Sequence, residues 1–137
     1  MSKHANNPAV AYFPNVEFHK HLGVEILETA DDYVKMRLPH RKELTGGGDA
    51  YHGGVVASLM DCAGSLACYC GHDLSKGFRG STVTLTIQYI SAARGENLIA
   101  EGQVNKRGKE LIFSDVTITT ENEGRLIAKG VLVYRLV

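Results

Sequence analysis

One helical block in a chain otherwise patterned for strands is the feature that most constrains how this sequence can fold. Between residues 53 and 71 the apolar side chains recur at helical spacing and fall within one arc of about 140°. They belong to Val55, Val56, Leu59, Met60, Ala63, Leu66, Ala67 and Cys70. This helix is the only predicted element able to cover one face of a sheet.

Strand patterns lie on both sides of this block. Residues 24–38 alternate apolar and charged side chains around a turn at Ala30-Asp31-Asp32, which indicates a hairpin. Four further runs follow the helix, at residues 81–90, 97–105, 110–120 and 125–136. Because short connections make consecutive strands antiparallel neighbours, these runs predict a four-stranded meander. The fold class is therefore α+β, with antiparallel strands packed on one long helix.

The chain has 137 residues, which is short enough for one domain, and we predict that residues 16–137 form it. Residues 1–15 are polar, contain Pro8 and Pro14, and are expected to be loosely ordered. A short amphipathic helix that ends at Gly23 is predicted next, from the apolar residues Phe13, Val16, Phe18 and Leu22.

Charge argues against two classes of partner. Fifteen Lys and Arg residues balance fifteen Asp and Glu residues, so the formal net charge is zero. Nucleic acids and anionic membranes are bound by surfaces with an excess of cations, so we expect neither as a partner. No window of about twenty residues is free of charge, and the first ten residues lack the apolar core of a signal peptide. We expect a cytoplasmic protein.

The three cysteines, Cys62, Cys68 and Cys70, all lie in the helical block. Their odd number does not suggest a disulfide framework. On a helix Cys68 and Cys70 point about 200° apart, and Cys62 does not share a face with Cys68, so the spacing does not suit a zinc site. We expect small buried helix residues, and no metal or cofactor is predicted.

The other face of the predicted helix is built from small residues and one acid, namely Ala57, Ser58, Asp61, Gly64, Ser65 and Cys68. A solvated helix face normally carries Lys, Glu, Arg and Gln, and none is present here. Glycine inside a helix costs about 1 kcal/mol relative to alanine, so Gly64 suggests a close approach by a second helix or a ligand. Asp61 is the one charged group on this face.

His52, Gly53 and Gly54 stand at the start of the helix. Two glycines leave the first amides of a helix uncovered, and such amides can stabilise an oxygen that becomes negatively charged. Together with Asp61 eight residues further on, they make a more specific pattern than either feature alone.

The string HGGVVASLMDCAG resembles the hotdog-fold acyl-CoA thioesterases, in particular the phenylacetyl-CoA thioesterase group. The resemblance covers about residues 16–136 and includes STVTLTIQYISAARGENLIAEGQV. It implies a highly curved antiparallel sheet wrapped around one long helix. It also implies homodimers that assemble into homotetramers.

The resemblance further implies roles for individual residues. Asp61 is implied as general base or nucleophile, the Gly53 amide as the oxyanion donor, and His52 as a residue that shapes the site. Thr82 stands where the family has a hydroxyl near the thioester. One departure is that many relatives have an Asn six residues before the His, where this chain has Gly46. Thr45 or a water could replace that Asn, the loop could pair differently, or turnover could be weaker.

Spacing adds a constraint to these roles. Gly53 and Asp61 are separated by about 12 Å along one helix, so they cannot both reach one carbonyl group. If both act on one thioester, they come from different chains, related by a two-fold axis with antiparallel helices. We also predict that Gly54, Ser65 and Thr82 contact substrate, and that Arg94, Lys106 and Arg107 bind the phosphates of CoA.

Two other functions are compatible with a hotdog fold. A dehydratase needs a catalytic His facing an acid in its own arrangement, whereas here the His precedes two glycines and the acid lies on the helix. A non-catalytic acyl-CoA-binding or regulatory protein would explain the missing Asn, although the sequence shows no DNA-binding appendage. Hydrolysis of an acyl-CoA thioester to the free acid and CoA is the expected reaction.

Overall fold

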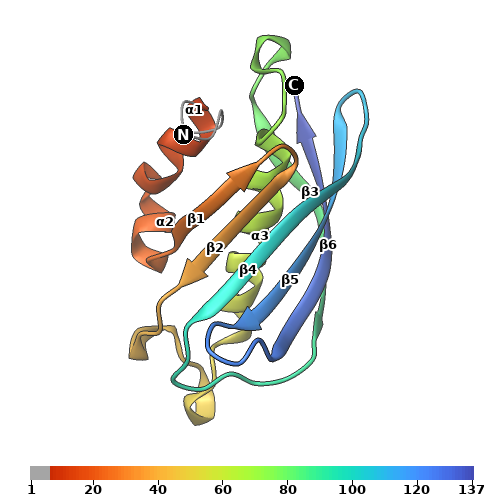
Figure 1. Cartoon of the computed structure of the whole chain (residues 1–137). Coiled ribbons are helices and arrows are strands. Elements are labelled where there is room, and N and C mark those ends of the chain that lie inside the picture. The colour runs from red at the N-terminus through yellow and green to blue at the C-terminus, as the bar shows by residue number, and fades with distance from the viewer. Residues whose placement is uncertain (1–6) are drawn as a thin grey trace.

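The computed structural model describes residues 7–137, and its elements follow the order that the sequence pattern indicates (Figure 1). The long helix α3 spans Gly53–Tyr69 and ends two residues before the predicted limit. The N-terminal helices are α1, Pro8–Tyr12, and α2, Glu17–Leu22. The strands are β1 Glu25–Ala30, β2 Tyr33–Leu38, β3 Gly80–Tyr89, β4 Leu98–Arg107, β5 Leu111–Thr120 and β6 Leu126–Leu136.

All six strands form one antiparallel sheet in the order β1-β2-β4-β5-β6-β3. The expected four-stranded meander is therefore wrong, because only β4, β5 and β6 are consecutive neighbours. β3 lies at the edge and pairs with β6, while β4 pairs with β2. The connection of residues 90–97 can span about 26 Å, whereas crossing from β3 to β4 takes about 14 Å, so this loop is long enough to skip two strands.

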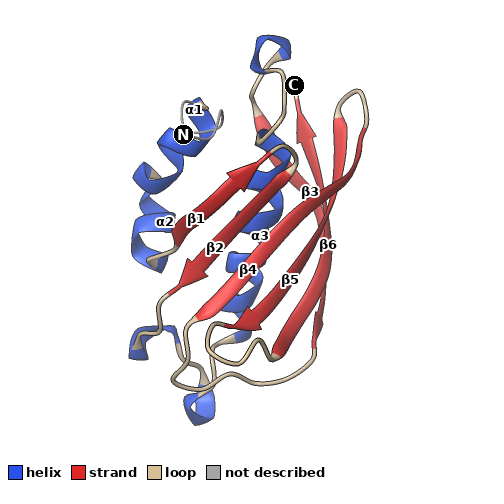
Figure 2. Ribbon diagram, viewed as in Figure 1, coloured by secondary structure: helices blue, strands red, loops and turns tan. Residues whose placement is uncertain are grey.

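The sheet curves around α3, which confirms the hotdog arrangement (Figure 2). The helix approaches the sheet most closely at two strand glycines. A Cβ added to Gly102 on β4 would meet the backbone carbonyl of Ala63, and one added to Gly130 on β6 would meet the side chain of Met60. Glycine in a strand often marks such an approach by another backbone. These two positions let the helix lie directly on the sheet.

The buried arc of α3 is wider than its apolar periodicity indicates. Cys62, Gly64 and Cys68 are buried together with the predicted core residues, and only one stripe of the central helix stays partly open. A Cβ on Gly64 would lie 3.1 Å from Leu132 and from Ser114 Oγ. Gly64 thus makes room for the chain's own sheet, and the expectation of a second helix or a ligand at this glycine is wrong.

Helical turns occupy part of the N-terminal segment that was expected to be loose. Residues 1–6 lie outside the described residues. Asn7 caps α1 by accepting hydrogen bonds from the amides of Ala9 and Val10, with Pro8 at the first helical position. A single turn at Phe13–Asn15 follows, and Phe13 is only 5% exposed. Burial of this ring holds the segment on the core.

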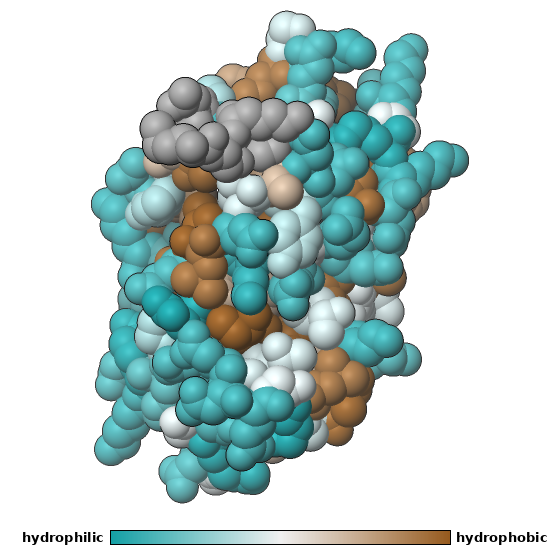
Figure 3. Space-filling model, in the orientation of Figure 1, coloured by the Kyte–Doolittle hydropathy of each residue, from teal (hydrophilic) through white to brown (hydrophobic). Residues whose placement is uncertain are grey.

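The helix α2 ends at Gly23, which has a left-handed φ of 81°, as the glycine position predicts. On the face of the molecule in Figure 3, apolar atoms gather in a band beside the N-terminal helices, and much of the remaining surface is hydrophilic. Within residues 7–137, no helix combines the length and the apolar character that crossing a membrane requires.

The contact between α3 and β4 predicts a large effect of one methyl group. We expect Gly102→Ala to lower the free energy of unfolding by about 1–3 kcal/mol, because the new methyl meets a helix carbonyl that cannot move alone. Gly47→Ala is the matched control, since a Cβ there has nothing within 4 Å. Its expected change is within about 0.5 kcal/mol. Urea unfolding followed by circular dichroism measures both, and equal stabilities would contradict this account of the helix position.

Candidate active site

Asp61 lies at the middle of the partly open stripe of α3, which consists of Ala57, Ser58, Asp61, Ser65 and Tyr69. Its Oδ1 accepts a hydrogen bond of 2.7 Å from the hydroxyl of Thr82 on β3. The Ser65 hydroxyl donates to the backbone carbonyl of Asp61 at 2.6 Å. No other hydrogen bond to the Asp61 carboxylate arises from residues 7–137. Among the described residues, the carboxylate is therefore oriented through one oxygen, and the other oxygen accepts no hydrogen bond.

A cleft of about 530 Å³ opens at this carboxylate, and we call it the Asp61 cleft. One side is made by α3 and the start of β3, the other by the N-terminal segment. Its lining residues are Pro8, Ala9, Tyr12, Phe13, Val16, His19, Asp61, Ser65, Leu66, Tyr69, Phe78, Gly80, Ser81, Thr82 and Tyr134. Burial, followed by the hydrogen bond with Tyr69, raises the pKa of Tyr134 well above its ordinary value. Its hydroxyl stays protonated at neutral pH.

The N-terminus of α3 presents one unused amide. His52 caps the helix, and its Nδ1 accepts a hydrogen bond of 2.8 Å from the Gly54 amide. The Gly53 amide has no acceptor among the described residues, while the Gly53 carbonyl accepts a 2.8 Å hydrogen bond from the Tyr89 hydroxyl. Of the two predicted glycine amides, only that of Gly53 is thus available to a substrate oxygen.

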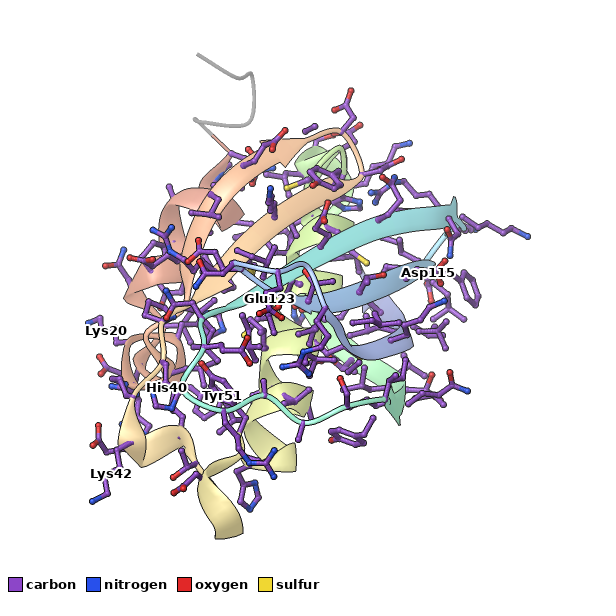
Figure 4. The ribbon with its side chains drawn as sticks, turned by 60° about the horizontal axis from the view of Figure 1, so that its bottom comes forward. Lys20, His40, Lys42, Tyr51, Asp115 and Glu123 are labelled. Atoms are coloured by element: carbon purple, nitrogen blue, oxygen red, sulfur yellow. The ribbon has the colours of Figure 1, made fainter. Side chains whose placement is uncertain are left out.

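The loop before α3 packs tightly against His52. A Cβ added to Gly46 would lie 3.3 Å from the His52 Cα atom, so a larger side chain here would need His52 to shift. The Thr45 hydroxyl donates to the Lys42 carbonyl at 2.7 Å. His40 and Tyr51 lie close together (Figure 4), with their rings edge to face at 5.4 Å. The Tyr51 hydroxyl also donates to the Glu96 carbonyl, which ties this loop to the one before β4.

A second cleft, of about 340 Å³, lies beside Gly53, and we call it the Gly53 cleft. Its lining residues are Ala50, Tyr51, Gly53, Val56, Tyr89, Ile90, Ser91, Ala92, Ala93 and Ile127. It shares no residue with the Asp61 cleft. Gly53 and Asp61 are about 12 Å apart along α3, in agreement with their separate clefts. Each chain carries two separate parts of the predicted site.

The predicted cations fall in two separate places. Arg94 is exposed next to the Gly53 cleft, and its Nε donates to the Gly48 carbonyl at 3.3 Å. Lys106 and Arg107 stand at the opposite end of β4. The Arg107 guanidinium donates to the Cys68 carbonyl at 2.9 Å and forms an ion pair of 2.7 Å with Asp32. These contacts hold the Arg107 side chain at the C-terminal end of α3.

All three cysteines are buried and free, as the sequence analysis expected. Desolvation by burial raises the pKa of both Cys62 and Cys68 to about 12 and that of Cys70 to about 11. Because the thiolate is the nucleophilic form of cysteine, these thiols are unsuited to attack a thioester at neutral pH. On the partly open stripe of α3, Asp61 carries the one charged side chain.

Sequence reasoning did not identify three parts of these clefts. Tyr89 and Tyr134 occupy ordinary alternating strand positions, and nothing local indicates that their hydroxyls reach a helix or a cleft. The third part is the wall of the Asp61 cleft that α1 forms. Asn7 followed by Pro8 is a recognisable helix start, so this wall did have a signal in the sequence.

Comparison with known proteins places the chain among thioesterases. Residues 49–127 match the family model described as thioesterase superfamily. Human acyl-coenzyme A thioesterase 13 is 32% identical over 115 residues, which cover 82% of this chain and 80% of that protein. Zebrafish thioesterase superfamily member 2 superposes with a TM-score of 0.84 at 26% identity, covering 100% of this chain and 99% of that one.

The Escherichia coli PaaI protein from the phenylacetic acid degradation operon has the same fold. Its TM-score is also 0.84, at 23% identity, and the match covers 94% of this chain and 90% of that one. These matches confirm the resemblance that HGGVVASLMDCAG and the strand after it indicate.

The contacts of Arg107 predict an effect on stability. We expect Arg107→Ala to lower the free energy of unfolding by about 1–2 kcal/mol, because it removes charged hydrogen bonds from the carbonyls at the end of α3. Lys106→Ala is the neighbouring control, with an expected change within about 0.5 kcal/mol. Thermal unfolding and KM for an acyl-CoA are measured on both variants. Unchanged stability with a raised KM would instead make Arg107 a phosphate-binding residue.

Proposed function

The chain belongs to the thioesterase superfamily and is a thioester hydrolase, and from this premise we propose that it cleaves acyl-CoA thioesters at a site shared between two copies. The products are the free acid and CoA. Human acyl-coenzyme A thioesterase 13 supports the choice of substrate by its name and its 32% identity. The shared site rests on one observation, namely that Gly53 and Asp61 line separate clefts of the same chain.

The chemistry requires these two residues to meet. An oxyanion donor lies about 3 Å from the carbonyl oxygen, and the attacking carboxylate or its water lies about 3 Å from the carbonyl carbon. A separation of about 12 Å along α3 rules out both contacts with one thioester inside one chain. A second chain that brings its own Gly53 to Asp61 removes this difficulty and creates two equivalent sites.

The edge strand β3 offers a way to bring the chains together. Its start, at Gly80–Thr82, lines the Asp61 cleft, and its end, at Tyr89, lines the Gly53 cleft. Among the described strands β3 pairs with β6 alone, and Val83, Tyr89 and Ile90 are exposed. An unpaired strand edge is a template for another chain. Antiparallel pairing of two β3 strands sets the start of one beside the end of the other, and so joins an Asp61 cleft to a partner's Gly53 cleft.

The reaction then uses the groups in the following way. The Gly53 amide of one chain donates to the thioester oxygen, which becomes negative as the carbonyl carbon is attacked. Asp61 of the other chain either takes a proton from an attacking water or attacks the carbon itself, and in the second route water later hydrolyses the anhydride. The C–S bond breaks, and the CoA thiolate leaves and is protonated. Thr82 orients Asp61 through their hydrogen bond.

The neighbouring predicted residues have supporting roles in this proposal. His52 holds the Gly54 amide and so shapes the first turn that presents Gly53. Ser65 lines the Asp61 cleft one turn beyond the carboxylate, where it contacts the acyl group. Arg94, exposed beside the Gly53 cleft, is the cation that we propose for the CoA phosphates. Arg107 donates hydrogen bonds to the carbonyls at the end of α3, and its predicted contact with the CoA phosphates is tested by the Arg107→Ala variant above.

Two further parts of the proposal concern assembly and location. The outer face of the sheet carries exposed Leu111, Phe113 and Val131, and this apolar patch supports pairing of two dimers into a homotetramer. Three free buried thiols accord with the reducing conditions of the cytoplasm, where we place the protein.

Removal of one charge tests the role of Asp61. We expect Asp61→Asn to lower kcat by about 100-fold or more, because it removes the base or nucleophile while keeping the side-chain volume. Asp115→Asn, an exposed position on β5, is the matched control and should keep kcat within about twofold. Release of CoA thiol is followed with a thiol reagent on a panel of acyl-CoAs. Wild-type turnover by Asp61→Asn would move the chemistry to another residue.

Mixing two inactive variants tests the shared site. Asp61→Asn keeps the Gly53 amide, and Gly53→Val keeps Asp61 but is intended to block that amide with a branched side chain, whose Cβ lies 3.7 Å from Tyr89. Random reassembly makes about half of the dimers mixed, each with one intact site, so about a quarter of wild-type activity should return. Circular dichroism and size-exclusion chromatography check that both variants fold and exchange chains. If they do and the mixture stays inactive, Asp61 works with an oxyanion donor of its own chain.

A further inference from the structure

The Asp61 cleft has a wall that takes no part in the proposed chemistry. Ala9, Tyr12, Phe13 and Val16, here called the N-terminal wall, line the cleft opposite α3. We propose that the N-terminal wall binds the acyl group and selects acyl-CoAs with a bulky apolar acyl group over those with a short one. This inference rests on the proposed function and assigns the acyl-binding part of that same site.

The N-terminal wall is held in place at both ends. At one end the Asn7 side chain donates to the Tyr69 carbonyl at 3.2 Å and also caps α1. At the other end the buried Phe13 ring stacks on His19 with centroids 3.9 Å apart. The Phe13 carbonyl also contacts His19 Nδ1 at 2.8 Å. Figure 1 shows α1 and α2 together on one side of the molecule. A wall anchored in this way presents a defined surface to a ligand.

The cleft runs from the reacting carboxylate along α3. Asp61, Ser65 and Tyr69 follow one another at successive turns of the helix, so the cleft extends about 12 Å beyond the carboxylate. The carbonyl group lies at the Asp61 end, and the remainder of the acyl group must then extend toward Tyr69. There the carbonyl of Tyr69 anchors Asn7, which brings α1 over this end of the cleft.

The side chains of the cleft suit an apolar group and not the CoA arm. No Lys or Arg is among the described residues that line it, so these residues offer no cation to the CoA phosphates. Apolar and aromatic surface comes from the N-terminal wall and from Phe78, while Tyr134 closes the cleft beneath Gly80. An acyl group long enough to reach the N-terminal wall buries its own apolar surface and that of the wall. An acetyl group ends near Asp61 and gains nothing from the wall.

The test fills the cleft from the N-terminal wall. Ala9→Trp places a large ring in the cleft, and Ala11→Trp is the matched control, because Ala11 lies on the same helix, is exposed and does not line the cleft. We expect Ala9→Trp to weaken binding of S-dodecyl-CoA, a non-hydrolysable thioether, by about tenfold or more, since the ring displaces the buried chain. Binding of S-ethyl-CoA should change by less than about twofold, and Ala11→Trp should change neither. Isothermal titration calorimetry measures the affinities of the wild type and of both variants for each thioether.

Tyr12→Ala provides a second variant that does not depend on fitting a new ring. Tyr12 is 64% exposed, so the Tyr12→Ala substitution leaves the core intact. We expect this variant to lose about two- to tenfold of the wild type's preference for S-dodecyl-CoA over S-ethyl-CoA, because the apolar surface of Tyr12 is removed. Equal weakening of both thioethers by Ala9→Trp, or no change in either, overturns the N-terminal wall as the acyl-binding surface. Failure of the wild type to hydrolyse any acyl-CoA is a different result and counts against the proposed function.

Discussion

The close approach of α3 to the sheet at Gly102 and Gly130 is the contact on which the rest of the structure depends. Because neither strand carries a side chain there, the backbone of the helix lies against β4, and Met60 lies against β6. This position sets the distance from Asp61 to the Thr82 hydroxyl on β3. It also brings the Gly53 carbonyl within reach of Tyr89 at the other end of that strand. The distance between α3 and the sheet therefore sets the positions of both parts of the candidate site.

A straight helix also imposes a limit on the chemistry. It places an unused amide and a carboxylate on one rigid element, but it keeps them about two turns apart. Because the helix is rigid, each group has a defined direction. In the mechanism proposed above, the amide and the carboxylate of one chain are too far apart to act on the same thioester. The same element that orients the groups thus makes a second copy of the chain necessary in the mechanism proposed above.

Local patterns predicted the elements better than their arrangement. The long helix, the hairpin around Asp31 and all the strand segments could be predicted because they depend on periodicity and turn residues close in sequence. The strand order could not, because it depends on pairing between β3 and β6, which no local pattern records. Gly64 was misjudged for a similar reason, since its neighbour Leu132 is far along the chain. Asp61, Thr82 and Gly53 were singled out through the resemblance and their catalytic roles stay predictions, whereas the Tyr89 contact needed the three-dimensional structure.

The position of β3 has a consequence for how the molecule forms. Among the described strands its partner in the sheet is β6, so β3 has no strand to pair with until residues 126–136 have been synthesised. The long loop between β3 and β6 must close before the two strands can form hydrogen bonds, so this contact is slow to form. During synthesis the hairpin of β1 and β2 can form early, while β3 is still without hydrogen-bond partners. The strand that borders both clefts is thus completed only after residues 126–136 have been synthesised, and a nascent chain that stalls before β6 exposes an aggregation-prone edge.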